Sequence, residues 1–392
     1  RDQRLSRGLG DVYKRQGLYS SSSTKLVLSA VSFEENTAVD MEGSHVFGRG
    51  GAIAFSLPIE FRLENVVIRK NKAVYGGGVY SPLDAVVTIG NSVLDSNIAS
   101  MSGGGLYTNT SSSLKAYDSI VRNNSALTED GGGAYLMTWL DYSGNASVTA
   151  LFSNLSFVDN VAVNGVGGGL CRSGEVSMEV RNSSFWGNTG SEGGGLYLAN
   201  GSSTFTNVSL VSNYGVGSGG GLKITGNESL LMDSSLLRLN SAGESGGGMY
   251  LGSEVQVQTS DMLYSENVAY GSTGGGGAVY GEGSVIFSSE GDVFEGNRAK
   301  QGSGGGLYVA GVSQVTCSSC VLQNNTAYRH GGGMYTESWD VSLEEGSMVL
   351  NNVAETGDGG GLYSSSSTKL VLSAVSFAVS YTHLRAHETI AD

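Results

Sequence analysis

Carboxylate side chains beside glycine clusters are the first residues to consider for catalysis, and they are Asp130, Glu192, Glu244 and Asp358. Clustered carboxylates, often with Ca²⁺ and a basic residue, perform polysaccharide lyase or glycoside hydrolase chemistry. These four lie in separate repeat units, and no Arg or Lys recurs beside them. The pattern therefore predicts no catalytic centre, and a carbohydrate-active β-helix enzyme is kept as the alternative hypothesis.

Cysteine and histidine offer little further chemistry. Cys317 and Cys320 form a lone C-x-x-C pair, and Cys171 is the third cysteine. A zinc site needs a second pair of ligands, and a redox C-x-x-C usually opens a helix, whereas this pair lies on an expected strand. We expect core packing or a local disulfide there. His45 and His330 have no evident Ser or Cys partner for a nucleophilic triad, and no cofactor or metal ion is expected.

A recurring tyrosine is the main candidate for ligand binding. Exposed rings in a row are able to stack on sugar rings, while rings that stack on one another to stabilise neighbouring repeats are the alternative. Ala54, Cys171 and Lys223 interrupt the column. The candidate ligand face consists of Tyr80, Tyr107, Tyr135, Trp139, Tyr197, Tyr250, Tyr280, Tyr308 and Tyr335.

These tyrosines belong to an internal repeat of about 27 residues. Each unit reads apolar-x-x-Asn, a variable segment, Gly-Gly and a small residue, then an apolar residue and usually Tyr. We expect the asparagines to stack as a structural column, each side-chain amide bonding to the backbone or to the next asparagine. The column comprises Asn36, Asn71, Asn97, Asn124, Asn160, Asn188, Asn213, Asn240, Asn267, Asn297, Asn325 and Asn352.

The spacing within the repeat separates strands from loops. The small residue that ends a glycine cluster lies 19 residues before the next asparagine in nine of eleven intervals. A fixed spacing preserves strand register, because a slip of one residue would turn every strand inside out. The segment from Asn to the next cluster varies in length, as a loop does. Alternating apolar residues and tyrosines predict half-buried strands, so stacked units form a parallel β-solenoid of about twelve coils.

Composition excludes several protein classes. The chain has 62 glycines, two prolines and a net charge of −14 in 392 residues. Collagen needs Gly at every third position and abundant Pro, and a hydrophobic content of 39% argues against ordinary disorder. No apolar run reaches the length of about 18 residues that a membrane helix requires. The acidic balance argues against nucleic acid as a partner.

The two ends are interpreted as foreign sequence. Asp11–Gln16 and Val379–Leu384 fit one sequencing-adaptor oligonucleotide read from opposite strands, in inverted orientation. Gly17–Phe33 recurs letter for letter at Gly361–Phe377. The predicted organisation is a parallel β-helix repeat domain over 17–377, a fragment of a gene that runs past both ends, between non-native segments 1–16 and 378–392.

Nine asparagines stand in Asn-x-Ser/Thr sequons. They permit N-glycosylation in a secreted eukaryotic protein, but Asn and Ser are both abundant and chance predicts a similar number. The sequons begin at Asn109, Asn123, Asn145, Asn154, Asn182, Asn200, Asn207, Asn227 and Asn324.

Some units resemble a known family of repeats. Gly50-Gly51-Ala52-Ile53 and Gly276-Gly277-Ala278-Val279, combined with Phe-x-x-Asn pairs such as Phe157/Asn160 and Phe294/Asn297, look like the repeats of chlamydial-type polymorphic outer membrane proteins. The resemblance implies a right-handed parallel β-helix, an autotransporter-passenger-like role and adhesion. Most units depart from it with Gly-Gly-Gly-Leu-Tyr and an aliphatic residue in place of Phe. Similar repeats also suit large surface proteins of algae or protists.

The sequence as a whole predicts an all-β, right-handed parallel β-helix solenoid with a non-catalytic role. We expect an extracellular or cell-surface protein, located at the outer membrane if bacterial, that serves as a structural or adhesive rod. Its expected partners are glycans or another cell surface, without nucleic acid and without direct membrane insertion of this segment. Two insertions are candidate recognition loops: Thr37–Gly51, and the segment after Tyr135 with Trp139, Asp141 and Tyr142.

Overall fold

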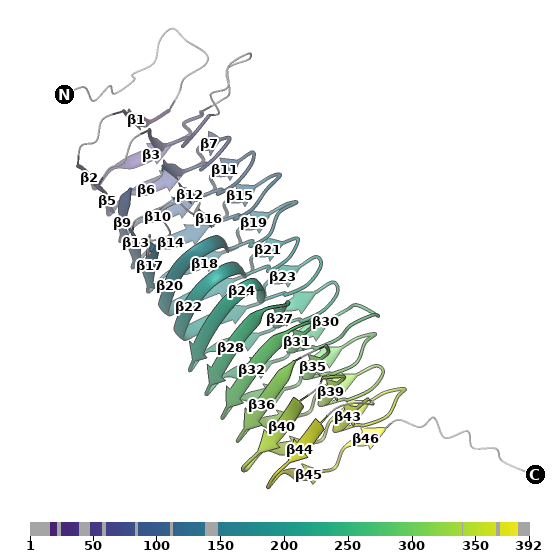
Figure 1. Ribbon diagram of the computed structural model, residues 1–392. Helices are drawn as coiled ribbons and strands as arrows, with labels where there is room; N and C mark the ends of the chain where they lie inside the picture. The colour runs from purple at the N-terminus through teal and green to yellow at the C-terminus, as the bar shows by residue number, and fades with distance from the viewer. Residues whose placement is uncertain are drawn as a thin grey trace, which may run out of the picture.

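The computed structural model describes residues 16–21, 25–38, 48–56, 60–82, 85–109, 113–137, 148–311, 313–338, 340–365 and 369–382. In these residues the chain is all-β and winds into a right-handed parallel β-helix of about twelve coils. Figure 1 shows the rod, with β1 (Leu18–Ser20) at one end and β46 (Tyr381–Thr382) at the other. Each strand pairs in parallel with the equivalent strands of the neighbouring coils. The predicted fold class is confirmed.

A repeat of about 27 residues suggests two or three short strands in each coil. The described coils contain up to four, because the fourth strand is only two residues long. The first strand follows the glycine cluster. These first strands are β1, β4 (Ile53–Phe55), β8 (Val79–Ser81), β12 (Leu106–Asn109), β16 (Ala134–Met137), β27 (Met249–Leu251), β31 (Val279–Gly281), β35 (Leu307–Val309), β39 (Met334–Thr336) and β43 (Leu362–Ser364).

The second and third strands lie in the part of the repeat with fixed spacing. The second strands are β2 (Leu26–Ser29), β5 (Glu60–Glu64), β9 (Val86–Gly90), β13 (Ser113–Tyr117), β17 (Val148–Ser153), β28 (Val255–Ser260), β32 (Val285–Glu290), β36 (Gln314–Ser318), β40 (Asp340–Glu344) and β44 (Lys369–Leu372). The third strands are β3 (Ser32–Glu34), β6 (Val67–Arg69), β10 (Val93–Asp95), β14 (Ile120–Arg122), β18 (Ser156–Val158), β25 (Leu236–Arg238), β29 (Leu263–Ser265), β33 (Val293–Glu295), β37 (Val321–Gln323), β41 (Met348–Leu350) and β45 (Ser376–Ala378).

The fourth strand has two residues and directly follows the column asparagine. These strands are β7 (Lys72–Ala73), β11 (Ile98–Ala99), β15 (Ser125–Ala126), β19 (Val161–Ala162), β21 (Thr189–Gly190), β23 (Tyr214–Gly215), β26 (Ser241–Ala242), β30 (Val268–Ala269), β34 (Arg298–Ala299), β38 (Thr326–Ala327), β42 (Val353–Ala354) and β46. They form a separate narrow sheet along the rod. Because β45 and β46 complete the last coil, the structure describes part of the segment predicted as foreign, and that boundary stays a prediction.

In three central coils the strands join. β20 (Leu170–Trp186) and β22 (Leu196–Val211) run through the first three strand positions, and β24 (Leu222–Asp233) runs through the first two. The register between neighbouring coils shifts where these strands turn, between Ser173 and Val176 in β20. These coils therefore present the longest continuous stretches of parallel sheet in the rod.

One-residue corners turn the chain between the later strands. The residue two before the third strand and the residue before the column asparagine both have positive φ, as at Asn182 (48°) and Glu266 (56°). Asn, Asp and Gly enter this left-handed region at lower cost than other residues. Short turns of this kind keep the path through the second, third and fourth strands the same in each coil, so that equivalent side chains lie above one another.

The glycine cluster marks the place where two walls of the solenoid meet. A Cβ atom on Gly220 would lie 2.4 Å from the carbonyl oxygens of Gly247 and Ser241. Gly219, which precedes it, has a φ of 70°. The second residue of the fourth strands from β7 to β42 is Ala or Gly and is buried, and Ala242 is fully buried at the same corner. Side chains would hold these walls apart, so the repeat requires glycine and alanine here.

The core is a set of apolar columns that run along the rod. Phe157 and Phe185 stack with ring centroids 4.7 Å apart, and Tyr264 and Phe294 stack at 4.6 Å. Each inward residue of one coil therefore contacts its equivalent in the next coil. Such stacking makes the stability of each coil depend on its neighbours.

A serine ladder lies at the corner before the third strand. Ser92 Oγ accepts a hydrogen bond from the backbone N–H of Val66 in the previous coil (3.1 Å) and donates one to Gly90 O (2.7 Å). Asp292 takes this position in one coil, where burial raises the pKa of its carboxyl. The serines that accept the same N–H bond in other coils are Ser119, Ser183, Ser235 and Ser347.

The contact between walls predicts a difference between two glycines. Gly220→Ala is expected to lower the free energy of unfolding by about 1–3 kcal/mol, the usual cost of overpacking. Gly281→Ala is the matched control, because its Cβ would meet no atom closer than 3.8 Å; a change within about 0.5 kcal/mol is expected. Guanidinium unfolding followed by circular dichroism measures both. Equal stability of the two variants would contradict the wall contact.

Candidate functional site

The asparagine column is a continuous ladder of hydrogen bonds inside the rod. The backbone N and side-chain Nδ2 of Asn188 both donate to Oδ1 of Asn213, each at 3.0 Å. Nδ2 of Asn188 also donates to Phe157 O in the previous coil (3.0 Å). The same pattern links successive asparagines from Asn36 to Asn352.

This ladder leaves no group available to a ligand. The column asparagines from Asn71 to Asn352 are fully buried, and both amide N–H groups of an inner member such as Asn188 are used. A buried amide without partners costs about 1–3 kcal/mol, so each asparagine requires the next. The column is therefore part of the structure of the rod and is not a candidate ligand site.

The tyrosine column lies on the outer side of the first strands and is covered. Tyr250 and Tyr280 stack at 5.3 Å, and Tyr308 and Tyr335 stack at 4.7 Å. Loop side chains pack against the column, as Tyr75 does against Tyr107. Only 7–9% of the surface of each member is exposed in seven of the eight described candidates, Tyr80, Tyr107, Tyr135, Tyr250, Tyr280, Tyr308 and Tyr335.

These seven tyrosines are therefore not a row of exposed rings, and they stack on one another as the alternative hypothesis describes. Each ring covers its neighbour's face, so the faces are not available to sugar rings. Tyr197 is half-buried and donates to or accepts from Thr225 Oγ1 at 3.0 Å. Trp139, the remaining member of the predicted ligand face, lies outside the described residues.

The tyrosine hydroxyls are proton donors. Tyr250 and Tyr280 both hydrogen-bond to the carboxylate of Glu282, the latter at 3.0 Å. Burial raises the pKa of Tyr250 and Tyr280 far above the ordinary phenol value and raises the pKa of Tyr308 to about 12. These phenols therefore remain protonated at neutral pH, which makes them unsuitable as general bases.

A lysine interrupts the column and brings charges together. Lys223 Nζ lies 2.7 Å from Glu192 Oε1 and 4.3 Å from the centroid of the Tyr250 ring. Through Tyr250 this pair is linked to Glu282. The break that Lys223 makes in the tyrosine column is evident from the sequence, but its pairing with Glu192 is not, because the two residues lie in different coils.

The structure does not bring the four candidate carboxylates together. Asp130 Oδ1 accepts the backbone N–H of Val166 (2.9 Å), and burial raises the pKa of this carboxyl. Glu244 and Asp358 are exposed in other coils. In the part of the chain that the structure describes, no group of three or more His, Cys, Asp or Glu side chains is arranged to hold a metal ion.

The cysteines and histidines take structural positions. Cys317 and Cys320 form a disulfide, and both are fully buried in the core. Cys171 is buried in the tyrosine column, where burial raises the pKa of its thiol. His330 Nδ1 accepts the backbone N–H of Asp358 (2.9 Å). His45, together with most of the insertion Thr37–Gly51 and the residues Trp139, Asp141 and Tyr142, lies outside the described residues.

An uncharged outward surface lies on the third strands of three central coils. Its centre is Trp186, which is 49% exposed on the sheet surface. Val158 and Val211 pair with Trp186 in the neighbouring coils. We call this surface the neutral window, and it consists of Ser156, Val158, Ser184, Trp186, Ser209 and Val211.

Ion pairs border the neutral window along the rod. Asp95 and Arg122 pair at 3.0 Å on the N-terminal side, and Arg238 and Glu266 pair at 2.8 Å on the C-terminal side. Trp186 was not among the predicted ligand-binding residues. The sequence pattern that could have identified it is an aromatic residue at an outward position of a strand, next to Gly187.

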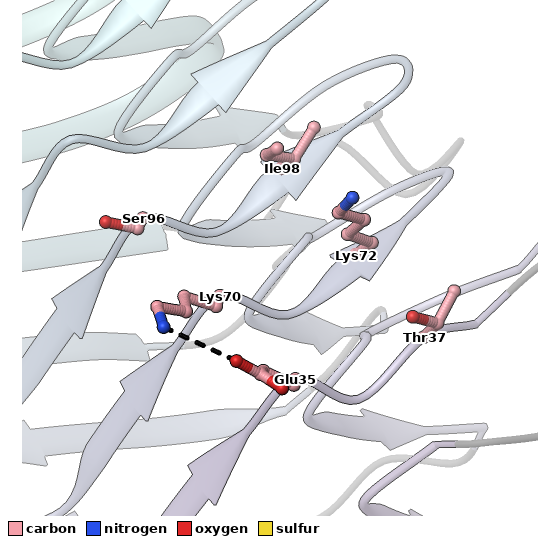
Figure 2. A pocket seen from close by; sticks show the side chains of 6 residues that line it. All are labelled: Glu35, Thr37, Lys70, Lys72, Ser96 and Ile98. Carbon is pink, nitrogen blue, oxygen red and sulfur yellow. Dashed lines mark hydrogen bonds and ion pairs between the residues drawn. The ribbon is translucent and has the colours of Figure 1, made fainter.

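A shallow hollow of about 410 Å³ lies near the N-terminal end of the rod. It is lined by Glu35, Thr37, Lys70, Lys72, Ser96 and Ile98, which Figure 2 shows at the ends of third strands and the starts of fourth strands. Lys70 Nζ lies 3.4 Å from Glu35 Oε1. The lining therefore mixes cations with a carboxylate and selects no single class of charged ligand.

A buried ion pair interrupts two apolar columns of the core. Arg172 takes the position that Leu136 and Leu198 hold in the adjacent coils, and Glu228 takes the position of Val255. Both side chains are fully buried and bonded to each other. This pair was not predicted, although the sequence shows two charged residues at inward strand positions.

The surroundings of Arg172 are built to fit the guanidinium. Its Nη1 donates to Ala199 O and its Nη2 to Ser203 Oγ, both at 3.0 Å. A Cβ atom on Gly201 would lie 2.4 Å from Nη1, so glycine makes room. Arg172 Nε and Glu228 Oε2 lack a hydrogen-bond partner among the described residues. Desolvation of this kind opposes the mutual attraction of the charges.

Comparison with known proteins supports the fold. The family model described as right handed beta helix region matches residues 194–377. Neither the curated proteins nor the solved structures gave a match. Among the described residues there is no helix with the length and hydropathy needed to cross a bilayer.

The buried pair predicts opposite outcomes for a single and a double substitution. Glu228→Val leaves a buried guanidinium without its partner, so a loss of about 3–5 kcal/mol in the free energy of unfolding is expected. The double variant Arg172→Leu with Glu228→Val restores the residue types of both columns and is expected to match or exceed the parent. Chemical unfolding of the three proteins measures the difference. A double variant as unstable as the single one would contradict this account.

Proposed function

We propose that this chain is a non-catalytic, extracellular or cell-surface β-helix repeat protein that acts as a structural or adhesive rod. The observation that carries the proposal is the neutral window: an exposed tryptophan on a flat sheet, between valines and beside serine hydroxyls. Aromatic rings that stay exposed on a rigid surface are common elements of binding sites.

The chemistry of the neutral window favours a neutral glycan as its ligand. A sugar ring offers C–H groups to an aromatic face and hydroxyls to hydrogen-bonding side chains, and the window provides Trp186 together with Ser156 and Ser184, whose hydroxyls lie 3.2 Å apart. The ion pairs lie outside the window, so a charged ligand would find no partner within it. This surface takes the place of the buried tyrosine column as the proposed ligand face.

The disulfide supports the extracellular part of the proposal. Disulfides persist in secreted and surface proteins and are rare where thiols are kept reduced. Cys317 and Cys320 are fully buried, so their bond is shielded from reductants in the folded rod. The resemblance of the Gly-Gly-Ala-Ile and Phe-x-x-Asn units to chlamydial-type polymorphic outer membrane proteins agrees with a passenger-like adhesive rod.

A carbohydrate-active enzyme is the second candidate, and the pairing of Lys223 with Glu192 favours it. A polysaccharide lyase needs a base and a cation beside the substrate carboxylate, and a hydrolase needs two carboxylates. Here Lys223 is 8% exposed and occupied by Glu192 and by the Tyr250 ring. The neighbouring phenols hold their protons. We therefore rank the enzyme below the rod.

The proposal predicts that the Trp186 side chain supplies a large part of the binding energy for a neutral glycan. Protein made without glycans in an oxidising compartment is tested on neutral glycan arrays and on cell surfaces. Trp186→Ala is expected to weaken binding at least tenfold, about 1.4 kcal/mol. Ile286→Ala is the matched control, because Ile286 is 42% exposed on the second-strand face, and unchanged binding is expected.

Two results would contradict the adhesive rod. The first is a failure of the binding assay, seen either as equal binding by the Trp186 and Ile286 variants or as the lack of any ligand for the parent protein. The second is turnover of an acidic polysaccharide that Lys223→Ala abolishes, which would establish the enzyme instead.

A further inference from the structure

The fold divides the asparagines of this chain into two classes. In every coil the residue two positions after the column asparagine is Ala or Gly, as in Asn240–Ala242 and Asn188–Gly190. That residue is buried at the corner where the walls meet, and Ala242 has no exposed surface. Serine or threonine is thereby excluded there, so none of the twelve column asparagines stands in an Asn-x-Ser/Thr sequon.

The sequons concentrate in the remaining asparagines. Twelve of the 25 asparagines form the column, which leaves 13 others, and nine of these 13 begin a sequon. About one residue in five of the chain is Ser or Thr, so chance would give about three sequons among 13 asparagines. Over the whole sequence the number of sequons is close to the chance number. Among the 13 asparagines outside the column it is about three times the chance number.

The sequon asparagines lie on the outside of the rod. Seven have described side chains, and all seven are exposed: Asn123, Asn154, Asn182, Asn200, Asn207, Asn227 and Asn324. All except Asn227 have φ between 48° and 59° and therefore form one-residue corners. The turn explains Asn at a corner, but it does not require Ser two residues later. Asn65 and Asn91 form the corner before the third strand, as Asn154, Asn182 and Asn207 do in other coils. In both, the residue two positions after the asparagine is valine.

The corner amides keep an N–H group that the fold does not use. Asn207 Nδ2 donates to Asn182 Oδ1 (2.9 Å), and Asn154 Nδ2 donates to Asp118 Oδ1 (2.8 Å). A primary amide has two N–H groups, so each of these nitrogens can bond to carbon without breaking its hydrogen bond.

We propose that the exposed sequon asparagines of the rod are acceptor sites for N-linked oligosaccharides, with one oligosaccharide at a time on each stacked pair. The donor is an oligosaccharide linked to a polyprenyl diphosphate. The side-chain Nδ2 attacks the anomeric carbon, a C–N bond forms, the bond from that carbon to the diphosphate oxygen breaks, and Nδ2 loses one proton. The polyprenyl diphosphate leaves with the electron pair of the broken bond.

Stacking of the coils limits how many sites are filled together. Asn182 and Asn207 lie in adjacent coils and are hydrogen-bonded to each other. Strands in neighbouring coils are about 4.8 Å apart, which is too close for two hydrated oligosaccharides side by side. Asn200 and Asn227 form a second such pair, since Asn227 N donates to Asn200 Oδ1 (3.3 Å). Each pair is therefore expected to carry one oligosaccharide.

The proposed acceptor sites border the neutral window. The sequon serines of Asn154, Asn182 and Asn207 are Ser156, Ser184 and Ser209, which belong to the window. Oligosaccharides at this corner would cover the side of the rod next to the neutral window. The part of the third-strand face from Trp186 onward, away from this corner, would stay accessible. The inference rests on the extracellular part of the proposed function, because the donor is met on the secretory route.

The experiment is expression of the full chain behind a secretory leader in a eukaryotic cell, followed by glycopeptide mass spectrometry of the secreted, folded protein. We expect oligosaccharides at Asn123 and Asn324. Asn154, Asn182 and Asn207 take the same corner in three consecutive coils, so each molecule is expected to carry an oligosaccharide either at Asn182 or at its neighbours Asn154 and Asn207, and never at two adjacent members of this stack. Ser209→Ala removes the Asn207 sequon while keeping both asparagines, and occupancy of Asn182 is expected to rise at least 1.5-fold. Ser184→Ala is the reciprocal variant, and it is expected to raise the occupancy of Asn207.

Two results would overturn the proposal. Secreted, folded protein without an oligosaccharide at any described sequon would refute the acceptor sites. Full occupancy of Asn182 and Asn207 in the same molecule would refute the one-per-pair rule. Neither result affects the adhesive rod, because binding through Trp186 is measured on protein that carries no oligosaccharide.

Discussion

The structure depends on the asparagine ladder, in which each buried amide satisfies the backbone and side chain of the coil before it. Both N–H groups of Asn188 and the carbonyl oxygen of Asn213 are engaged in this way. The ladder allows a tight turn without leaving buried polar groups unpaired. Because each partner lies one coil away, the segment from the glycine cluster to the asparagine must have nearly the same length in each coil, which explains why its spacing is 19 residues in nine of eleven intervals.

Strand segments of equal length place equivalent residues above one another in neighbouring coils, and this explains most other features of the rod. Apolar residues become core columns, tyrosines become a covered outer stack, and small residues allow the walls to meet. Departures from a column are then local and informative. Lys223 in the tyrosine column gains an ion pair, and Arg172 and Glu228 in apolar columns must pair with each other. Among the described residues Trp186 stays 49% exposed on the third-strand face, whereas loop side chains such as Tyr75 pack on the tyrosine column.

The repeat makes the fold predictable from sequence, and the site much less so. The spacing of Asn and Gly predicts a parallel solenoid, because both residues have backbone reasons to be where they are. The burial of the tyrosines could not be predicted, since strand alternation shows that they point outward but not that loops such as the one with Tyr75 fold over them. The pairs Glu192–Lys223 and Arg172–Glu228 join different coils, so the residue spacing within one repeat unit does not show that they meet.

The free energy of unfolding of Asn213→Ala measures how much the rod depends on the asparagine ladder. This change leaves the backbone N–H and side-chain amide of Asn188 without their shared acceptor, so the account predicts a loss of about 3 kcal/mol or more. Asn227→Ala, at an exposed asparagine of the neighbouring coil, is the matched control and is expected to change stability by less than about 1 kcal/mol. Equal stability of the two variants would contradict the ladder as the interaction on which the rod depends.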